Sequence, residues 1–75
     1  MRALLEHMVK AIVDHPEDIR VEEVAQEQTL RLQLFVHKDD IGKVIGKQGR
    51  TAKAIRTILY AAPSSYKRVQ LDIME

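Results

Sequence analysis

The stretch that decides the fold is IGKVIGKQGRTAKAI, residues 41–55. It contains every glycine of the chain, and Gly46 and Gly49 enclose the dipeptide Lys47-Gln48. Apolar residues recur at helical spacing on both sides of this pair, which predicts a short helix before it and a longer one after it. The loop lies at the N-terminus of the second helix, where unpaired N–H groups and the helix dipole favour a phosphate. The same spacing also fits a plain helix-to-helix connection that only needs the backbone freedom of glycine.

Basic residues concentrate in the same stretch. Residues 1–28 carry seven acids against three bases, a net charge of −4, whereas residues 29–75 carry nine bases against four acids, a net charge of +5. Residues 41–57 contain no acid, and their bases are Lys43, Lys47, Arg50, Lys53 and Arg56. Such clustering indicates an anion-facing surface, although a charge run is also typical of a solvated helix face.

Other glycine motifs fit this stretch poorly. A Walker A loop has four residues between its glycines and then Lys-Ser/Thr, but here three residues separate Gly42 from Gly46, and Gln48 follows Lys47. The dinucleotide-binding fingerprint needs a Gly-x-Gly pair after a strand, which the chain lacks. A membrane GxxxG pair needs an apolar helix, which the lysines exclude.

The pattern changes on the N-terminal side of the loop. Residues 30–37 alternate between apolar and polar, residues 19–25 alternate more weakly, and a polar turn around Glu27-Gln28 joins these two predicted strands. Asp39 or Asp40 is expected to cap the short helix with a side-chain oxygen.

Both ends of the chain also carry regular patterns. Residues 1–14 present an apolar stripe at helical spacing, and Pro16 is expected to end this helix. The helix after the glycine loop continues through residue 62 and ends at Pro63. Residues 69–73 alternate and predict a third strand.

The predicted element order is helix, strand, strand, helix, helix, strand. This order favours an α+β fold in which three helices cover one face of a three-stranded sheet. The connection from the second strand to the third is long enough for a crossover, so these two strands are expected to be parallel.

Composition limits what the chain can be. Its 75 residues are enough for one domain with one core, and the absence of cysteine suits a reducing cytosol. Charged residues interrupt every apolar run near the N-terminus, so neither a signal peptide nor a membrane span is expected. Aromatic residues make up only 4% of the chain, which argues against stacking of several bases on aromatic rings.

Residues 41–55 resemble the signature of KH domains, an Ile-Gly-x-x-Gly loop between two helices. A helix and a strand before the core resemble the type II arrangement, with a single KH domain over residues 1–75 and the GxxG loop at 46–49. The whole chain resembles the small bacterial single-KH proteins of the KhpA type. This resemblance implies a cytoplasmic single-stranded RNA-binding protein. It is expected to act as an RNA chaperone and post-transcriptional regulator, alone as a homodimer or with a larger KhpB (Jag-type) partner. In that family the pair is linked to cell elongation and wall synthesis.

The residues also predict how RNA would bind. Bases would lie in a groove between an apolar wall and the edge of the sheet, while the RNA backbone would pass over the glycine loop. The expected apolar wall is formed by Ile41, Val44 and Ile45. The expected loop and phosphate contacts are Gly46, Lys47, Gln48, Gly49, Lys43, Arg50 and Lys53.

No residue pattern indicates catalysis, so no enzyme activity, cofactor or small-molecule substrate is expected. His7, His15 and His37 are too dispersed for a metal site. Phe35 and the wide apolar stripe of the first helix fit either a contact surface or ordinary surface and core residues. The alternative function is a KH-fold protein-interaction module with little RNA binding. The basic loop favours RNA.

Overall fold

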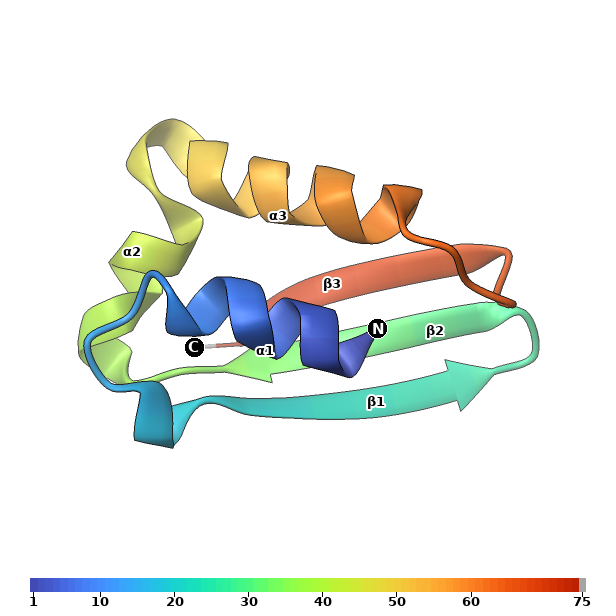
Figure 1. Cartoon of the computed structure of the whole chain (residues 1–75), viewed down its shortest axis with the longest axis horizontal. Helices are drawn as coiled ribbons and strands as arrows, with labels where there is room; N and C mark the ends of the chain where they lie inside the picture. The colour runs from blue at the N-terminus through green and yellow to red at the C-terminus, as the bar shows by residue number, and fades with distance from the viewer. Residues whose placement is uncertain (75) are drawn as a thin grey trace.

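A computed structural model of the chain describes residues 1–74 and has the predicted element order (Figure 1). The regular elements are α1 (Arg2–Lys10), β1 (Arg20–Gln26), β2 (Thr29–Phe35), α2 (Ile41–Ile45), α3 (Arg50–Ala61) and β3 (Arg68–Met74). Three short 3-10 turns lie between them: η1 (Pro16–Asp18), η2 (Lys38–Asp40) and η3 (Lys47–Gly49). The chain is therefore an α+β domain with three helices and three strands.

The sheet is mixed, with strand order β1-β2-β3. β1 pairs with β2 antiparallel, in a register that places Val21 opposite Leu34. β2 pairs with β3 in parallel, with Leu32 opposite Leu71, so the predicted crossover is confirmed. The chain travels from β2 to β3 through α2 and α3, which places the glycine loop in the crossover itself.

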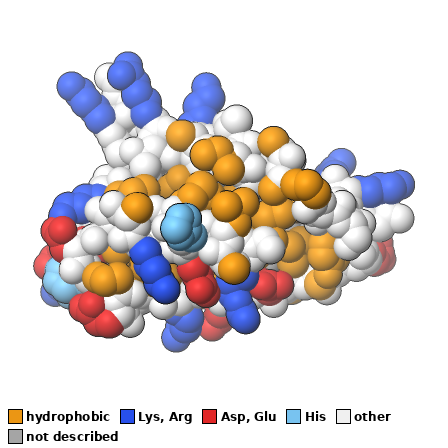
Figure 2. All heavy atoms as spheres, viewed as in Figure 1, with side chains coloured by type: hydrophobic (Ala, Val, Ile, Leu, Met, Phe, Trp, Pro, Cys, Tyr) orange, Lys and Arg blue, Asp and Glu red, His pale blue; other side chains and the backbone are white. Residues whose placement is uncertain are grey.

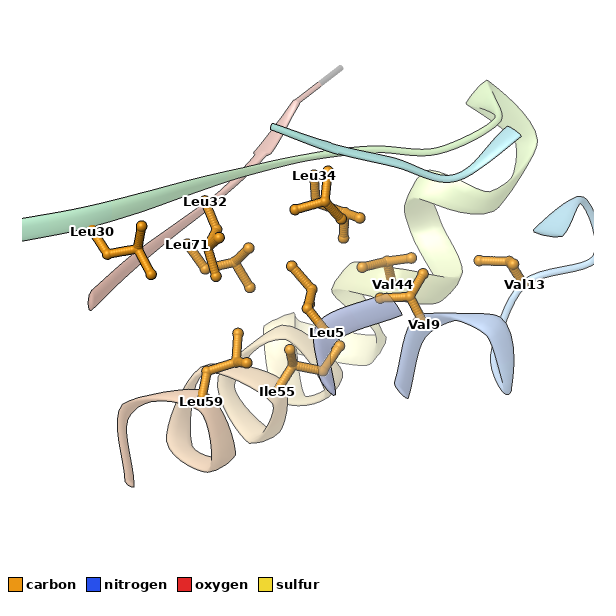
Figure 3. Close-up of a cluster of buried hydrophobic side chains, with 11 residues drawn as sticks. Leu5, Val9, Val13, Leu30, Leu32, Leu34, Val44, Ile55, Leu59 and Leu71 are labelled. Carbon is orange, nitrogen blue, oxygen red and sulfur yellow. The ribbon is translucent and has the colours of Figure 1, made fainter. Parts of the chain in front are cut away.

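The three helices lie on one face of the sheet and bury its apolar side (Figures 1 and 3). Leu32 and Leu34 of β2 point toward Leu5 of α1 and Leu59 of α3, and all four side chains are fully buried. The cluster also includes Val9, Val13, Val21, Leu30, Val44, Ile55 and Leu71. Because apolar side chains alternate along β2, one face enters this core and the other stays toward solvent.

The hairpin between β1 and β2 turns at Glu27-Gln28, as predicted. Glu27 has a φ of 54°, in the left-handed region that non-glycine residues adopt less readily. The pairing of Gln26 with Thr29 leaves only these two residues in the turn, which fixes the strand register without a glycine.

The first helix is shorter than predicted. α1 ends at Lys10, whereas the predicted helix extends to Asp14. The backbone N–H groups of Asp14 and His15 donate hydrogen bonds to the carboxylate of Asp40, at 3.3 and 3.0 Å, instead of continuing the helical ladder. Val13 is still buried and belongs to the core cluster.

The predicted capping by Asp39 or Asp40 is wrong. Asp40 occupies the N-cap position of α2, but its side chain makes no capping hydrogen bond there. The Asp40 carboxylate accepts a hydrogen bond from the backbone of His15 in the α1–β1 connection. The backbone N–H of Asp39 donates to His37 Nδ1 at 3.0 Å. The predicted end of α3 before Pro63 is confirmed, with Ala62 in the extended conformation that a following proline favours.

Candidate functional site

The glycine loop has a backbone that depends on Gly46. This residue has φ 78° and ψ 174°, a region essentially restricted to glycine. A Cβ here would also lie 2.8 Å from the backbone nitrogen of Thr51 and 2.6 Å from the Thr51 side-chain Cβ. Gly46 therefore serves two purposes, because it turns the chain out of α2 and lets the first turn of α3 approach closely.

The other end of the loop is also left-handed. Gln48 has φ 58°, and Gly49 has φ 75°. Lys47 and Gln48 are the first residues of the η3 turn, a position where backbone N–H groups have no acceptor within their own turn and point toward a ligand. The side chains of Lys47 and Gln48 are exposed, and Arg50 donates a 3.3 Å hydrogen bond to Gln48 Oε1.

Positive charge surrounds this loop. Lys47, Arg50 and Lys53 are exposed and form no ion pair with an acid within residues 1–74. Figure 2 shows Lys and Arg side chains that project from the end of the molecule where α2 and α3 meet. The structure therefore brings these three predicted cations together beside the loop.

Lys43 is placed differently. Its ammonium contacts the carboxylate of Asp14 and lies 4.0 Å from Asp40 Oδ1. The hydrogen bond to Asp14 raises the pKa of Lys43 above its ordinary value. Lys43 would have to leave Asp14 before it could neutralise a phosphate.

The three predicted apolar groove residues do not share one environment. Ile45 is exposed to 36% and Ile41 is half-buried, but Val44 is fully buried in the core. The prediction that Val44 lines an open groove is wrong, because on this helix Val44 is the residue turned toward the sheet (Figure 3). Two isoleucines remain as an apolar surface beside the loop.

Asp40 is the one buried charged residue among those described, with 1% exposure. Burial alone would raise its pKa, but hydrogen bonds from the N–H groups of Asp14 and His15 and from the His15 ring outweigh it, and the pKa is lowered. In return, the hydrogen bond to Asp40 raises the pKa of His15. The His15 ring also stacks on that of His37, with centroids 3.9 Å apart. This cluster fastens the α1–β1 connection to the start of α2, and sequence reasoning missed it because an Asp at a helix start resembles a cap.

The free edge of β3 carries two further contacts that the sequence did not indicate. Arg56 Nε donates to the carbonyl of Leu71 at 3.3 Å, and the N–H of Leu71 donates to Tyr60 Oη at 3.4 Å. Side chains of α3 thus form hydrogen bonds with backbone groups at the free edge of β3. No periodic signal in the sequence distinguishes such contacts from ordinary surface residues.

A helix–loop–helix on a mixed three-stranded sheet, with Gly-x-x-Gly between the helices, defines a KH-type domain. The preceding helix and strand give it the type II element order. Within residues 1–74, no helix is long and apolar enough to cross a membrane, and no group of three His, Asp or Glu side chains could hold a metal ion.

Comparison with known proteins identifies the family. The family described as "KhpA/KhpB, KH domain" matches residues 2–73, so the chain belongs to it. The chain is 55% identical over 76 residues to RNA-binding protein KhpA of Halalkalibacterium halodurans, with complete coverage of both. It is 56% identical over 73 residues to the protein of that name from Bacillus subtilis, covering 96% of this chain and 90% of the relative. The protein of that name from Chlamydia pneumoniae is 49% identical over 76 residues, covering 100% and 97%. No solved structure matches the chain.

Proposed function

We propose that this chain is a single-stranded RNA-binding protein whose GxxG loop grips the RNA backbone. The observation that carries the proposal is the loop itself, whose left-handed backbone lies beside three exposed cations that pair with no acid within residues 1–74. Its relatives carry the name RNA-binding protein, which supports the same conclusion. In this function the main-chain donors and cations bind phosphates, while bases lie against the exposed isoleucines and the β3 edge.

The charge of the loop favours RNA over the alternative of a protein-interaction module. A loop that had lost nucleic-acid binding would tolerate acids, but residues 41–57 carry none. The proposed contacts are Ile41, Ile45, Gly46, Lys47, Gln48, Gly49, Arg50 and Lys53, with Lys43 available only after release from Asp14.

The test is the double variant Lys47→Asp with Gln48→Asp. Two carboxylates in an exposed loop repel phosphates but remove no core contact, so single-stranded RNA binding should fall below detection while the melting temperature stays near that of the wild type. A fluorescence-anisotropy titration with a labelled tetranucleotide measures the first and thermal unfolding the second.

The matched control makes the same change of charge at exposed positions away from the loop, as Lys10→Asp with Gln26→Asp. It should keep wild-type affinity. Near-wild-type affinity in the loop variant would contradict the proposal and favour the protein-interaction alternative. Loss of its unfolding transition would instead show that the loop side chains are structural.

The family supports finer expectations. We propose that the chain acts in the cytoplasm as an RNA chaperone and post-transcriptional regulator that pairs with a KhpB (Jag-type) protein, in a role linked to cell elongation and wall synthesis. Co-purification of the chain with a Jag-type protein from the same cells tests that pairing.

Self-association is the remaining part of the proposal. Leu4 on α1 is exposed to 36% and Ile58 on α3 to 50%. Figure 2 shows apolar side chains spread over the face that these two helices form. Ile58→Asp should therefore shift a dimer toward monomer in analytical ultracentrifugation, because a charge would have to be desolvated in the interface. An unchanged sedimentation coefficient would exclude this face as the dimer contact.

A further inference from the structure

The end of α3 opposite the glycine loop carries a hollow that the proposed four-nucleotide contact does not use. Its volume is about 600 Å³, within the range of small-ligand sites. It is lined by Tyr60, Ala62, Ser64, Tyr66, Lys67, Arg68, Val69 and Gln70. These residues come from the end of α3, the start of β3 and the connection between them.

The composition of this hollow is unusual for the chain. It holds both tyrosines, although the whole sequence contains only three aromatic residues. Tyr60 is exposed to 49%, and Tyr66 is half-buried. Lys67 and Arg68 beside them are exposed, and neither forms an ion pair within the described part of the chain. Aromatic faces with neighbouring cations are the combination that holds a nucleotide by base stacking and phosphate contact.

A second hollow serves as a comparison. It lies on the open face of the sheet, has a volume of about 670 Å³, and is lined by Gln26, Glu27, Thr29, Arg31 and Gln70. It offers no aromatic ring and contains an acid, so size alone does not single out the first hollow. The aromatic and basic lining does.

The position of the first hollow connects it to the glycine loop. α3 has 12 residues and is about 18 Å long, with the loop at one end and the hollow at the other. β3 runs beside α3 over this distance (Figure 1). The side chains of Arg56 and Tyr60 on α3 form hydrogen bonds to the backbone of Leu71 on β3. An RNA strand that leaves the loop along the β3 edge would reach Tyr60 and then the hollow.

We propose that this hollow is a second RNA subsite, which stacks a base on Tyr60 or Tyr66 and contacts its phosphate through Lys67 or Arg68. The inference rests on the proposed function, because the glycine loop supplies the first contact. It extends the recognised RNA beyond the four nucleotides of a KH groove. Affinity then depends on RNA length in a way that a single groove does not produce.

The experiment compares labelled single-stranded RNAs of four and eight nucleotides, each a degenerate pool, by fluorescence anisotropy. An eight-mer offers about five registers to a four-nucleotide groove, so a statistical gain of about fivefold is expected without any subsite. Stacking of one further base should add about five- to tenfold to that gain. Stoichiometric titration confirms that one chain binds each eight-mer, which separates this gain from avidity.

The variants assign the gain to the hollow. Tyr66→Leu with Lys67→Gln should weaken the eight-mer about five- to tenfold and leave the four-mer unchanged. Leucine keeps the apolar packing of Tyr66 against the core, and thermal unfolding checks that the fold is retained. Tyr66→Phe with Lys67 unchanged is the conservative partner, since it keeps the ring and the charge and should keep the length dependence. Lys10→Gln on α1 removes one exposed charge elsewhere and should change neither affinity.

The outcomes separate the two proposals. If the eight-mer gains no more than the statistical fivefold, or if the Tyr66 and Lys67 changes weaken both RNAs equally, the second subsite is excluded. If Lys47→Asp with Gln48→Asp fails to weaken the four-mer, the proposed function itself is wrong. If the wild-type chain binds neither RNA, both proposals are overturned.

Discussion

At the scale of single residues, the three glycines have different importance. Gly46 combines a glycine-only backbone with close approach by Thr51, whereas a Cβ on Gly42 or Gly49 would meet nothing within 4 Å. Gly49 still has the left-handed φ of 75°. Spacing placed all three glycines in one motif, but only the folded backbone shows that Gly46 is the glycine that no other residue can replace.

Alanine substitution should reproduce this order. Gly46→Ala should cost about 3 kcal/mol or more in the free energy of unfolding, because it adds backbone strain and a steric clash. Gly49→Ala should cost about 1–2 kcal/mol for the left-handed conformation. Gly42→Ala lies in α2 at an exposed position and should be neutral or stabilising by up to about 1 kcal/mol. Urea unfolding measures all three, and equal costs at 42 and 46 would contradict the assignment.

The cluster around Asp40 should make stability depend on pH in two ranges. The raised pKa of His15 gives a stabilising contribution that is complete below pH 6.5 and is lost as the pH rises through the folded-state pKa. The lowered pKa of Asp40 gives a contribution that is present above pH 3.8 and is lost as the pH falls through its folded-state value. The carboxylates of Glu17 and Asp18 also raise the pKa of His15, whose ring stacks on that of His37.

We therefore expect wild-type stability to fall from pH 6 to pH 8 relative to the variant His15→Gln, which lacks this titration. Urea unfolding at several pH values in that range measures the difference. His7→Gln, an exposed change in α1, is the control and should parallel the wild type. A constant difference between wild type and His15→Gln across the range would show that the His15–Asp40 contact does not titrate.

At the scale of elements, periodicity predicted the type and order of every helix and strand, because each buries one face against a common core. The end of α1 was not predictable in this way. Its apolar stripe continues to Val13, which is indeed buried, while a tertiary hydrogen bond to Asp40 interrupts the helix. Patterns along the chain report which side chains enter the core, but they do not report polar contacts with residues distant in sequence.

The short helix α2 allows a direct test of which of its residues serve the core and which serve the RNA-binding surface. Val44 faces the core and its neighbour Ile45 faces outward beside the loop. Val44→Ser should destabilise the fold by about 2–4 kcal/mol, because it leaves a cavity and buries a hydroxyl. Ile45→Ser should keep the fold and weaken single-stranded RNA binding. Thermal unfolding and anisotropy on both variants measure this contrast, and loss of folding in Ile45→Ser would place Ile45 in the core instead.

At the scale of the whole molecule, the fold mixes an acidic N-terminal part with a basic C-terminal part. β1 lies beside β2, and Arg2 on α1 reaches Glu23 on β1 at 3.7 Å, so charges within the N-terminal part partly pair with one another. Lys43 is also neutralised, by Asp14 from the acidic part. The charge sums of the sequence predicted a basic surface, but they did not show which of its cations an acidic side chain would neutralise.

This division of charge sets the expected salt dependence of RNA binding. If Lys47, Arg50 and Lys53 each neutralise one phosphate of a single-stranded tetranucleotide, about three counterions are released. The slope of log K against log salt concentration should then be near −2. Lys43→Gln should leave this slope unchanged because Asp14 already neutralises its charge, whereas Lys53→Gln should make it shallower by about 0.7.

Unlabelled RNA duplex should compete poorly, since paired and stacked bases cannot enter a groove beside the loop. Anisotropy titrations at several salt concentrations measure the slopes. An affinity independent of salt, or displacement by duplex as effective as by single strand, would contradict a mechanism in which the loop holds phosphates and the groove holds unpaired bases.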